Sequence, residues 1–109
     1  MEIGFRDKKL REICEKEVVA RKKLGGACAR KLRIRLADLE AANAVTDLVA
    51  GKPHPLKHDR AGQFAVELSG GYRLVFVPGN DPVPRHPDKS IDWSRVTIIR
   101  IEFIGDYHD

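Results

Sequence analysis

The segment Val-Thr-Ile-Ile-Arg-Ile-Glu-Phe-Ile-Gly-Asp-Tyr-His, residues 96–108, decides how this chain of 109 residues folds. Ile99, Ile101 and Phe103 recur with a period of two, which predicts a β-strand with one fully apolar face. The opposite face of the strand carries Ile98, Arg100, Glu102 and Ile104. One apolar face and one mixed face indicate a central strand of a sheet, around which the rest of the chain is organised.

Three polar side chains with useful chemistry follow this strand, namely Asp106, Tyr107 and His108. Residues near a chain end usually fray, whereas a central strand holds the residues at its end against a rigid sheet. We therefore expect this carboxylate, phenol and imidazole to lie at the rim of a sheet and to form part of a site.

The N-terminal part of the chain predicts a strand followed by two helices. Residues 2–6 suit a short strand, and Asp7 is placed to cap a helix that starts at Lys8 and continues, with a break, to Leu24. Gly25-Gly26 interrupts the pattern, and a second helix is expected over about residues 27–42. The apolar stripe of this second helix consists of Cys28, Leu32, Leu36 and Leu39.

The C-terminal half predicts an antiparallel sheet. Residues 63–68 and 72–77 alternate between apolar and polar side chains on either side of Gly70-Gly71, which is typical of a hairpin. The connection over residues 78–93 is polar and contains four prolines, so we expect it to be only partly ordered. The order β-α-α-β-β-β predicts a single α+β domain over residues 1–109, with two N-terminal helices packed on a small antiparallel sheet.

Positive charge is concentrated in the first part of the chain. Residues 1–60 contain 15 Lys or Arg and 9 Asp or Glu, a net charge of +6, whereas residues 61–109 have a net charge of −2. Residues 21–35 contain no acidic residue and seven basic ones: Arg21, Lys22, Lys23, Arg30, Lys31, Arg33 and Arg35. Such a run suits a surface that binds a polyanion, but it is also compatible with a solvated helix face or a protein partner.

The cysteines, the lengths of the apolar runs and the histidine spacing bear on whether the protein binds a metal or crosses a membrane. Cys14 and Cys28 lack the spacing of a zinc site or a disulfide framework, and we interpret both as packing residues on helix faces. No apolar run is long enough to cross a membrane and no signal peptide is recognisable, so a cytoplasmic location is expected. His54 and His58 are four residues apart, but they lie in a proline-containing loop, so a metal site is disfavoured and no cofactor is expected.

Five residues form a candidate catalytic group if the last three strands are neighbours: His54, Arg73, Asp106, Tyr107 and His108. Two imidazoles can act as base and acid near neutral pH, and a guanidinium can stabilise charge on a phosphorane. This set fits metal-independent cleavage of RNA by attack of the ribose 2′-OH. The alternative readings are an ordinary loop histidine, an arginine in a cross-strand ion pair and a tyrosine that packs at the edge of the core.

Three stretches of the chain together resemble the HigB-type toxins of the RelE/ParE toxin–antitoxin superfamily, the plasmid maintenance killer proteins. These stretches are His-Pro-Leu-Lys-His-Asp-Arg-Ala-Gly-Gln-Phe at 54–64, Tyr-Arg-Leu-Val-Phe at 72–76 and the terminal Asp-Tyr-His at 106–108. The resemblance extends over nearly the whole chain and implies a RelE-like fold. The family usually has glycine where this chain has His58, and often tryptophan where it has Tyr72.

The resemblance also implies a function. It predicts a ribosome-dependent mRNA endonuclease that inhibits translation and is held inactive by a helix-turn-helix antitoxin, which alone would contact operator DNA. The five candidate residues match the family's site, and Lys57 together with the basic residues of 21–35 would contact RNA. Two alternatives remain, a gyrase inhibitor of the ParE kind, which needs no histidine pair, and a binding module with the same fold but no activity.

Overall fold

The computed structural model describes residues 1–107, so His108 lies outside the described residues. Its helices are α1 (Lys8–Glu15), α2 (Glu17–Leu24) and α3 (Gly26–Ala41). Its strands are β1 (Glu2–Phe5), β2 (His54–Pro55), β3 (Phe64–Glu67), β4 (Arg73–Pro78) and β5 (Ile98–Gly105). Short 3-10 turns lie at η1 (Val45–Asp47), η2 (His58–Arg60) and η3 (Trp93–Arg95).

The helices begin and break where the sequence predicts. Asp7 caps α1, and its carboxylate accepts a hydrogen bond of 2.9 Å from the backbone N–H of Leu10. The expected break falls at Lys16, whose extended backbone separates α1 from α2. After Gly25, α3 runs for 16 residues and buries Leu32 and Leu39 against the sheet.

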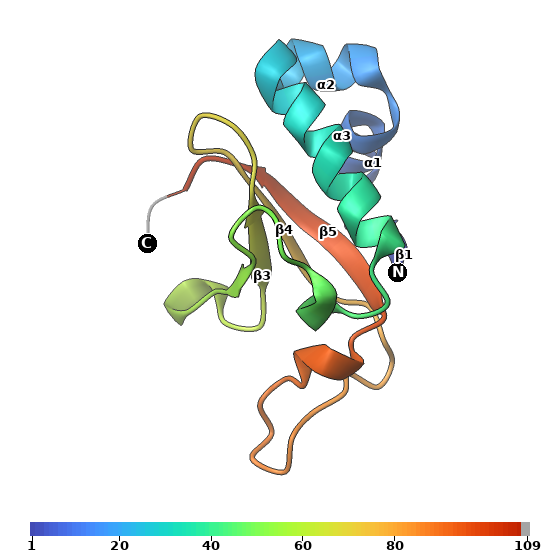
Figure 1. The fold of residues 1–109 in the computed structure, drawn as a ribbon, viewed down its shortest axis with the longest axis vertical. Helices are drawn as coiled ribbons and strands as arrows, with labels where there is room; N and C mark the ends of the chain where they lie inside the picture. Colours follow the sequence, from blue (N-terminus) through green and yellow to red (C-terminus); the bar gives the residue numbers. More distant parts are fainter. Residues whose placement is uncertain (108–109) are drawn as a thin grey trace.

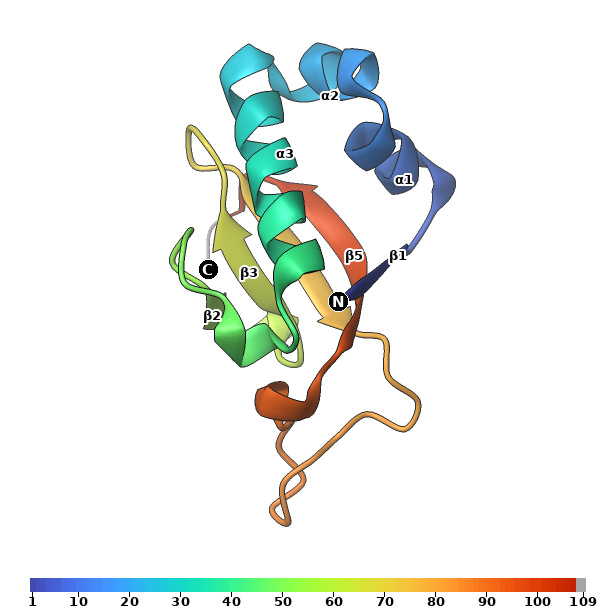
Figure 2. The same ribbon diagram turned by 45° about the vertical axis from the view of Figure 1, so that its right-hand side comes forward.

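The five strands form one sheet in the order β1-β5-β4-β3-β2 (Figures 1 and 2). The expected α+β class and the central position of β5 are confirmed. The sheet is not purely antiparallel, however, because β1 pairs with β5 in parallel. The helices lead from β1 at one edge of the sheet to β2 at the other, so β1 and β5 are joined by a long connection, as a parallel pair requires. The short β2, which pairs with β3, lies in a segment for which only a loop was predicted.

A register shift in β5 changes which side chains face the helices. Val75 pairs with Phe103, but the next residue of β4, Phe76, pairs with Ile101. Glu102 is therefore an extra residue without a direct partner on β4, which is the arrangement of a β-bulge.

The predicted alternation of β5 is wrong beyond this bulge. Ile99 and Ile101 pack in the main core, as expected, but Phe103 packs in a different cluster. Ile104, which was assigned to the mixed face, packs against the main core instead. The extra residue shifts the period of two by one position, so every side chain after it moves to the other face.

The two faces of the sheet are covered differently. The helices cover one face, and the main core lies between them and the buried residues of β3, β4 and β5. The other face, called the open face here, carries a small apolar cluster of Leu56, Ala65 and Val75, with Phe103 and Tyr107 packed against it. In Figure 1 the helices lie on the right of the sheet and η2 lies on its left.

The long connection between β4 and β5 is more regular than its sequence predicts. Asn80 accepts hydrogen bonds of 3.1 Å from the backbone N–H groups of Thr97 and Ile98, which closes the base of the connection. Asp92 caps η3 through the N–H of Ser94. The connection projects away from the sheet at the lower end of the molecule in Figure 1.

Candidate functional site

Most of the candidate residues belong to the open face. Directly paired residues of neighbouring strands project to the same side of a sheet, so the pairings define rows across this face. One row consists of His54, Ala65, Val75 and Phe103. The adjacent row consists of Glu67, Arg73 and Gly105. From strand spacing and rise, the Cα atoms of His54 and Arg73 are about 12 Å apart, which leaves room for a phosphate group between their side chains.

Arg73 joins β4 to the terminal segment, which is the part of the chain that follows Gly105. Its Nη1 donates to the carbonyl oxygen of Gly71 at 3.2 Å and to that of Tyr107 at 3.4 Å. The guanidinium carbon lies 5.1 Å from the centre of the Tyr107 ring. Asp106 lies beside the hairpin turn, since a Cβ atom at Gly71 would be 3.6 Å from its carboxylate oxygens. Arg73 therefore contacts Tyr107, and Asp106 adjoins the turn that Arg73 binds, while the roles expected of these residues stay predictions.

His54 reaches the site from the opposite edge of the sheet. Its imidazole is exposed, and Nδ1 lies 2.7 Å from the carbonyl oxygen of Lys52. A carbonyl oxygen only accepts, so Nδ1 carries the hydrogen in this contact, and Nε2 is the nitrogen that can take a proton. The neighbouring Lys57 is also exposed and precedes η2.

Arg60 belongs to the site although sequence reasoning did not select it. Its guanidinium carbon lies 4.7 Å from the ring centre of Phe103 and 4.4 Å from that of Tyr107. The two rings meet edge to face, with centres 6.1 Å apart. A basic residue in a polar loop has no periodic signal, and Phe103 was predicted to lie on the other face, so nothing in the sequence placed Arg60 beside these rings.

Gly105 allows Phe103 to lie flat against the end of β5. A Cβ atom at this position would come within 2.7 Å of the Phe103 ring, which is closer than any side chain permits. The glycine before the terminal Asp-Tyr pair therefore serves the packing of the open face.

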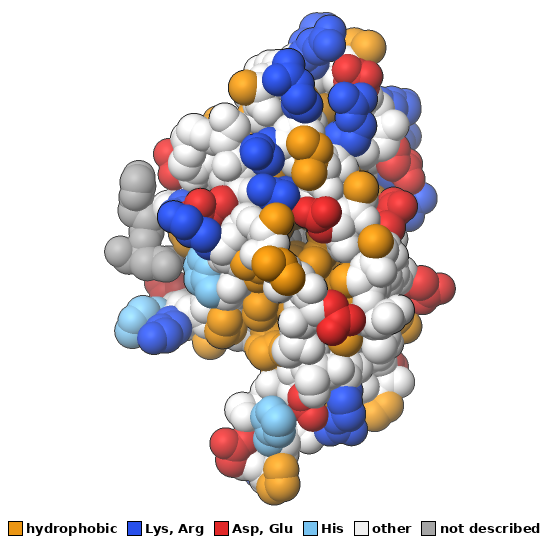
Figure 3. All heavy atoms as spheres, in the orientation of Figure 1, with side chains coloured by type: hydrophobic (Ala, Val, Ile, Leu, Met, Phe, Trp, Pro, Cys, Tyr) orange, Lys and Arg blue, Asp and Glu red, His pale blue; other side chains and the backbone are white. Residues whose placement is uncertain are grey.

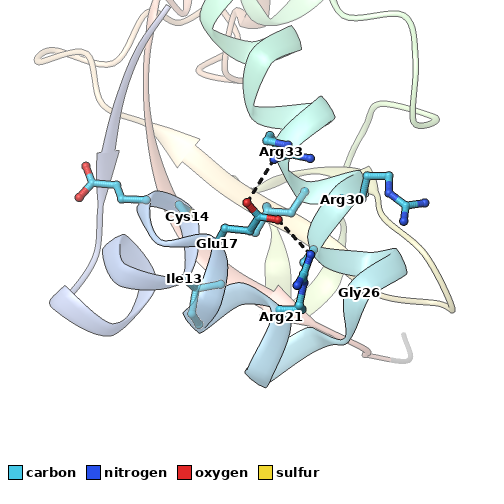
Figure 4. A pocket seen from close by; sticks show the side chains of 10 residues that line it. Ile13, Cys14, Glu17, Arg21, Gly26, Arg30 and Arg33 are labelled. Atoms are coloured by element: carbon cyan, nitrogen blue, oxygen red, sulfur yellow. Dashed lines mark hydrogen bonds and ion pairs between the residues drawn. The ribbon is translucent and has the colours of Figure 1, made fainter.

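Three arginines of the predicted RNA-binding run form ion pairs within the protein. Arg21 and Arg33 form ion pairs with Glu17, at 3.2 Å and 3.5 Å, beside a pocket between the helices (Figure 4). Arg35 is mostly buried and bonds to Asp38 and to the carbonyl oxygen of Glu67. Among residues 1–107, no ion pair engages Lys22, Lys23, Arg30 or Lys31.

The basic helices and the open-face site lie on either side of one turn. Gly25, which separates α2 from α3, and Gly26, the first residue of α3, line a shallow pocket together with Ser69 and Gly70 of the β3–β4 hairpin. Gly71 of the same hairpin adjoins Asp106 and accepts from Arg73. Figure 3 shows Lys and Arg side chains gathered over the upper end of the molecule, where α2 and the start of α3 lie.

Burial raises the pKa of the Cys14 thiol to about 12, because a thiolate would be poorly solvated between the helices, and Glu15 adds to this effect. Cys14 is therefore inert as a nucleophile and packs on its helix, as predicted.

Within residues 1–107, His, Cys, Asp and Glu side chains form no group of three that is suited to a metal ion. None of the helices in that range is long and apolar enough to cross a membrane.

Solved bacterial toxins share this fold. The YoeB/ParE toxin from Agrobacterium tumefaciens matches with a TM-score of 0.60 and 13% identity, over 99% of this chain and 100% of that one. The YoeB-YefM complex from Staphylococcus aureus matches with a TM-score of 0.60 and 16% identity, over 100% of this chain and 98% of that one. The YoeB dimer from the same organism gives a TM-score of 0.57 at 17% identity, with the same coverage.

No family model and no curated protein matches the sequence. At 13–17% identity the structural likeness concerns the fold alone. The chain therefore has the α+β fold of YoeB/ParE-type toxins, which confirms the fold that the resemblance implied.

Proposed function

We propose that this chain is a HigB-type toxin of a type II toxin–antitoxin system, which cleaves mRNA on the ribosome without a metal ion. The observation that carries this proposal is that Arg73 contacts Tyr107 on the open face, on which His54 also lies, while Asp106 adjoins the turn that Arg73 binds. The resemblance adds His108, which follows directly in the sequence.

In this mechanism one imidazole removes the proton of the ribose 2′-OH, which attacks the adjacent phosphorus atom. Nε2 of His54 suits this task because Nδ1 is engaged with Lys52. Arg73 stabilises the negative charge on the phosphorane oxygens, and His108 protonates the leaving 5′-oxygen. Tyr107 and Asp106 hold the terminal segment and the unpaired nucleotide in place.

The basic surface of α2 and α3 would bind ribosomal and messenger RNA. Residues of these helices proposed for this contact are Arg21, Lys22, Lys23, Arg30, Lys31 and Arg33, and Lys57, before η2, is proposed to add a contact of its own. Arg35 is left out because its guanidinium is committed to Asp38 and Glu67. RNA binding by surface cations weakens steeply with salt, so translation inhibition would do the same.

A helix-turn-helix antitoxin is the proposed protein partner, with operator DNA bound only through it. One structural neighbour is a complex, YoeB-YefM, which supports a protein partner for this fold. Translating ribosomes would place the active toxin in the cytoplasm.

The test compares two arginines on the same face of the sheet. Arg73→Ala is expected to lower the rate of mRNA cleavage about 10²–10³-fold, because it removes the group proposed to stabilise the transition state. Arg100→Ala is the matched control, since Arg100 pairs with Val77 on the open face but is bound to Glu102. Cleavage is read by primer extension on mRNA after induction and on purified programmed ribosomes.

The outcomes separate the alternatives. Intact mRNA together with DNA damage after induction would indicate a gyrase inhibitor of the ParE kind. Absence of toxicity would indicate a binding module. Cleavage that survives both Arg73→Ala and His108→Ala would show that the proposed residues do not perform the reaction.

A further inference from the structure

Arg60 connects three separate parts of the open face. The residue lies in η2, shortly after His54 in the chain, and its guanidinium covers the rings of Phe103 at the end of β5 and Tyr107 in the terminal segment. Its Nη1 donates to Oε1 of Gln63 at 3.2 Å, which fixes the orientation of the guanidinium from its own side of the site.

Two guanidinium groups contact the ring of Tyr107. Arg60 and Arg73 approach its ring to 4.4 Å and 5.1 Å, from different strands and loops of the sheet. A cation–π contact contributes about 0.5–2 kcal/mol, depending on how well it is shielded from water. The Arg60 side chain is half-buried, so its contacts are partly shielded. Arg73 also binds the backbone of Tyr107, whereas Arg60 contacts the ring.

The segments that carry the proposed catalytic groups lie outside the long strands of the sheet. His54 belongs to a strand of two residues at the sheet edge, and the loop after it is anchored by the buried Leu56. Tyr107 lies beyond the last residue of β5. Arg60 extends from η2, which follows the first of these segments, to the Tyr107 ring in the second.

We propose that Arg60 is a positioning residue that holds the His54 loop and the terminal segment at the spacing the reaction needs. This inference rests on the proposed function. A planar guanidinium can lie against two rings and bond to Gln63 at once, whereas a lysine ammonium retains the charge without the flat face. Positional errors of about 1 Å at reacting groups can cost 10²-fold in rate.

The experiment uses the full chain with Arg60→Met, Arg60→Lys and a matched control, Arg11→Met. Arg11 lies 5.4 Å from the ring centre of Phe5 in another part of the molecule, so the control also removes one arginine–ring contact. Single-turnover cleavage on programmed ribosomes gives the rate constant and the ribosome concentration at half saturation. NMR spectra of labelled tyrosine and phenylalanine rings report the packing of Tyr107 and Phe103.

Arg60→Met is expected to lower the rate constant about 10²-fold with less than a threefold change in half saturation, and to shift the ring signals of Tyr107 and Phe103. Arg60→Lys should recover about tenfold of this loss, and Arg11→Met should match the wild type. If Arg60→Met does not fold, Arg60→Lys serves as the test. A lower rate constant at an unchanged ribosome concentration for half saturation would then support the proposal.

Two results would contradict the proposal that Arg60 is a positioning residue. A rise in half saturation with an unchanged rate constant would make Arg60 a simple RNA-binding charge, and wild-type kinetics in Arg60→Met would make it dispensable. If the wild-type chain does not cleave mRNA, the proposed function fails and the spectra alone decide: shifted Tyr107 signals support the holding role, and unchanged signals refute it.

Discussion

The two long connections of the molecule use their residues in opposite ways. The site connection, residues 49–63, carries His54, Leu56 and Arg60, and each of these side chains belongs to the open face. The long connection, residues 79–97, directs its polar side chains mainly at its own backbone. Arg85 donates to the carbonyl oxygen of Lys89, and Arg95 donates to that of Arg85.

The long connection is ordered by its own hydrogen bonds, whereas the site connection contributes side chains to the open face. The long connection is held by hydrogen bonds around Asn80, Asp88 and Asp92, which close it as a unit. In the part of the chain that the structure describes, side-chain hydrogen bonds of the site connection are limited to those of His54 and Arg60. The site connection thus depends on the sheet for its shape, and its side chains stay available for chemistry.

The largest expected effect concerns one histidine from each connection. His54→Ala should lower mRNA cleavage about 10²–10⁴-fold, as the loss of a general base does. His86→Ala should leave cleavage unchanged, because His86 is exposed and lies in the long connection, near Asp92. Single-turnover kinetics on programmed ribosomes measure both, and equal losses would remove the functional distinction between the two connections.

The next effect concerns how each connection is anchored. Leu56 is 7% exposed in the open-face cluster, so Leu56→Ala should lower the free energy of unfolding by about 2–5 kcal/mol. Ile91 is only partly buried against the main core, and Ile91→Ala should cost about 1 kcal/mol. Urea denaturation gives both values. A larger loss for Ile91→Ala would show that the long connection also depends on the sheet.

A smaller effect concerns strained backbone in each connection. His58 and Lys89 are not glycines but have φ angles of +56° and +74°, in the left-handed region. Glycine adopts this region without the steric cost, so each change to glycine should raise stability by about 0.5–1 kcal/mol. Thermal unfolding measures both, and a destabilised His58→Gly variant would indicate that its imidazole contributes a favourable contact.

The smallest effect is local and depends on pH. Hydrogen bonds from Ser94 and then Arg95 lower the pKa of Asp92 from its ordinary 3.8 to about 2. A lowered pKa means that this carboxylate supports the folded long connection above pH 4 and loses that contribution as the pH falls towards 2. The NMR signal of the Ser94 amide should titrate with a midpoint near pH 2 and should not titrate in Asp92→Asn. A midpoint near 4 would contradict the capping role.

The regular elements followed from the sequence because their signals are local. The cap at Asp7, the Gly25-Gly26 break and the Gly70-Gly71 turn each depend on residues close together in the chain. Both turn glycines have positive φ angles, +65° and +83°, as the predicted hairpin requires. The contact between Arg73 and Tyr107 was also predictable, since it needs only that β4 and β5 be neighbours.

Features that depend on pairing between distant residues could not be predicted in this way. The parallel pairing of β1 with β5 joins residues almost a hundred positions apart. The bulge at Glu102 leaves no trace in a sequence that alternates without a break, so Phe103 was placed on the wrong face. Arg60 was missed for the same reason, because its partners are the two rings that the bulge and the chain end bring to the open face.

The extra residue at Glu102 makes the packing of β5 sensitive to the length of this strand. Deleting it would restore strict alternation and would send Phe103 into the helices, and the terminal Asp-Tyr would leave the strand on the wrong side. We therefore expect a deletion in β5 to disturb the open face more than a change of length in the long connection does. A design that grafts the proposed site onto another scaffold must therefore include the bulge at Glu102 as well as the site residues.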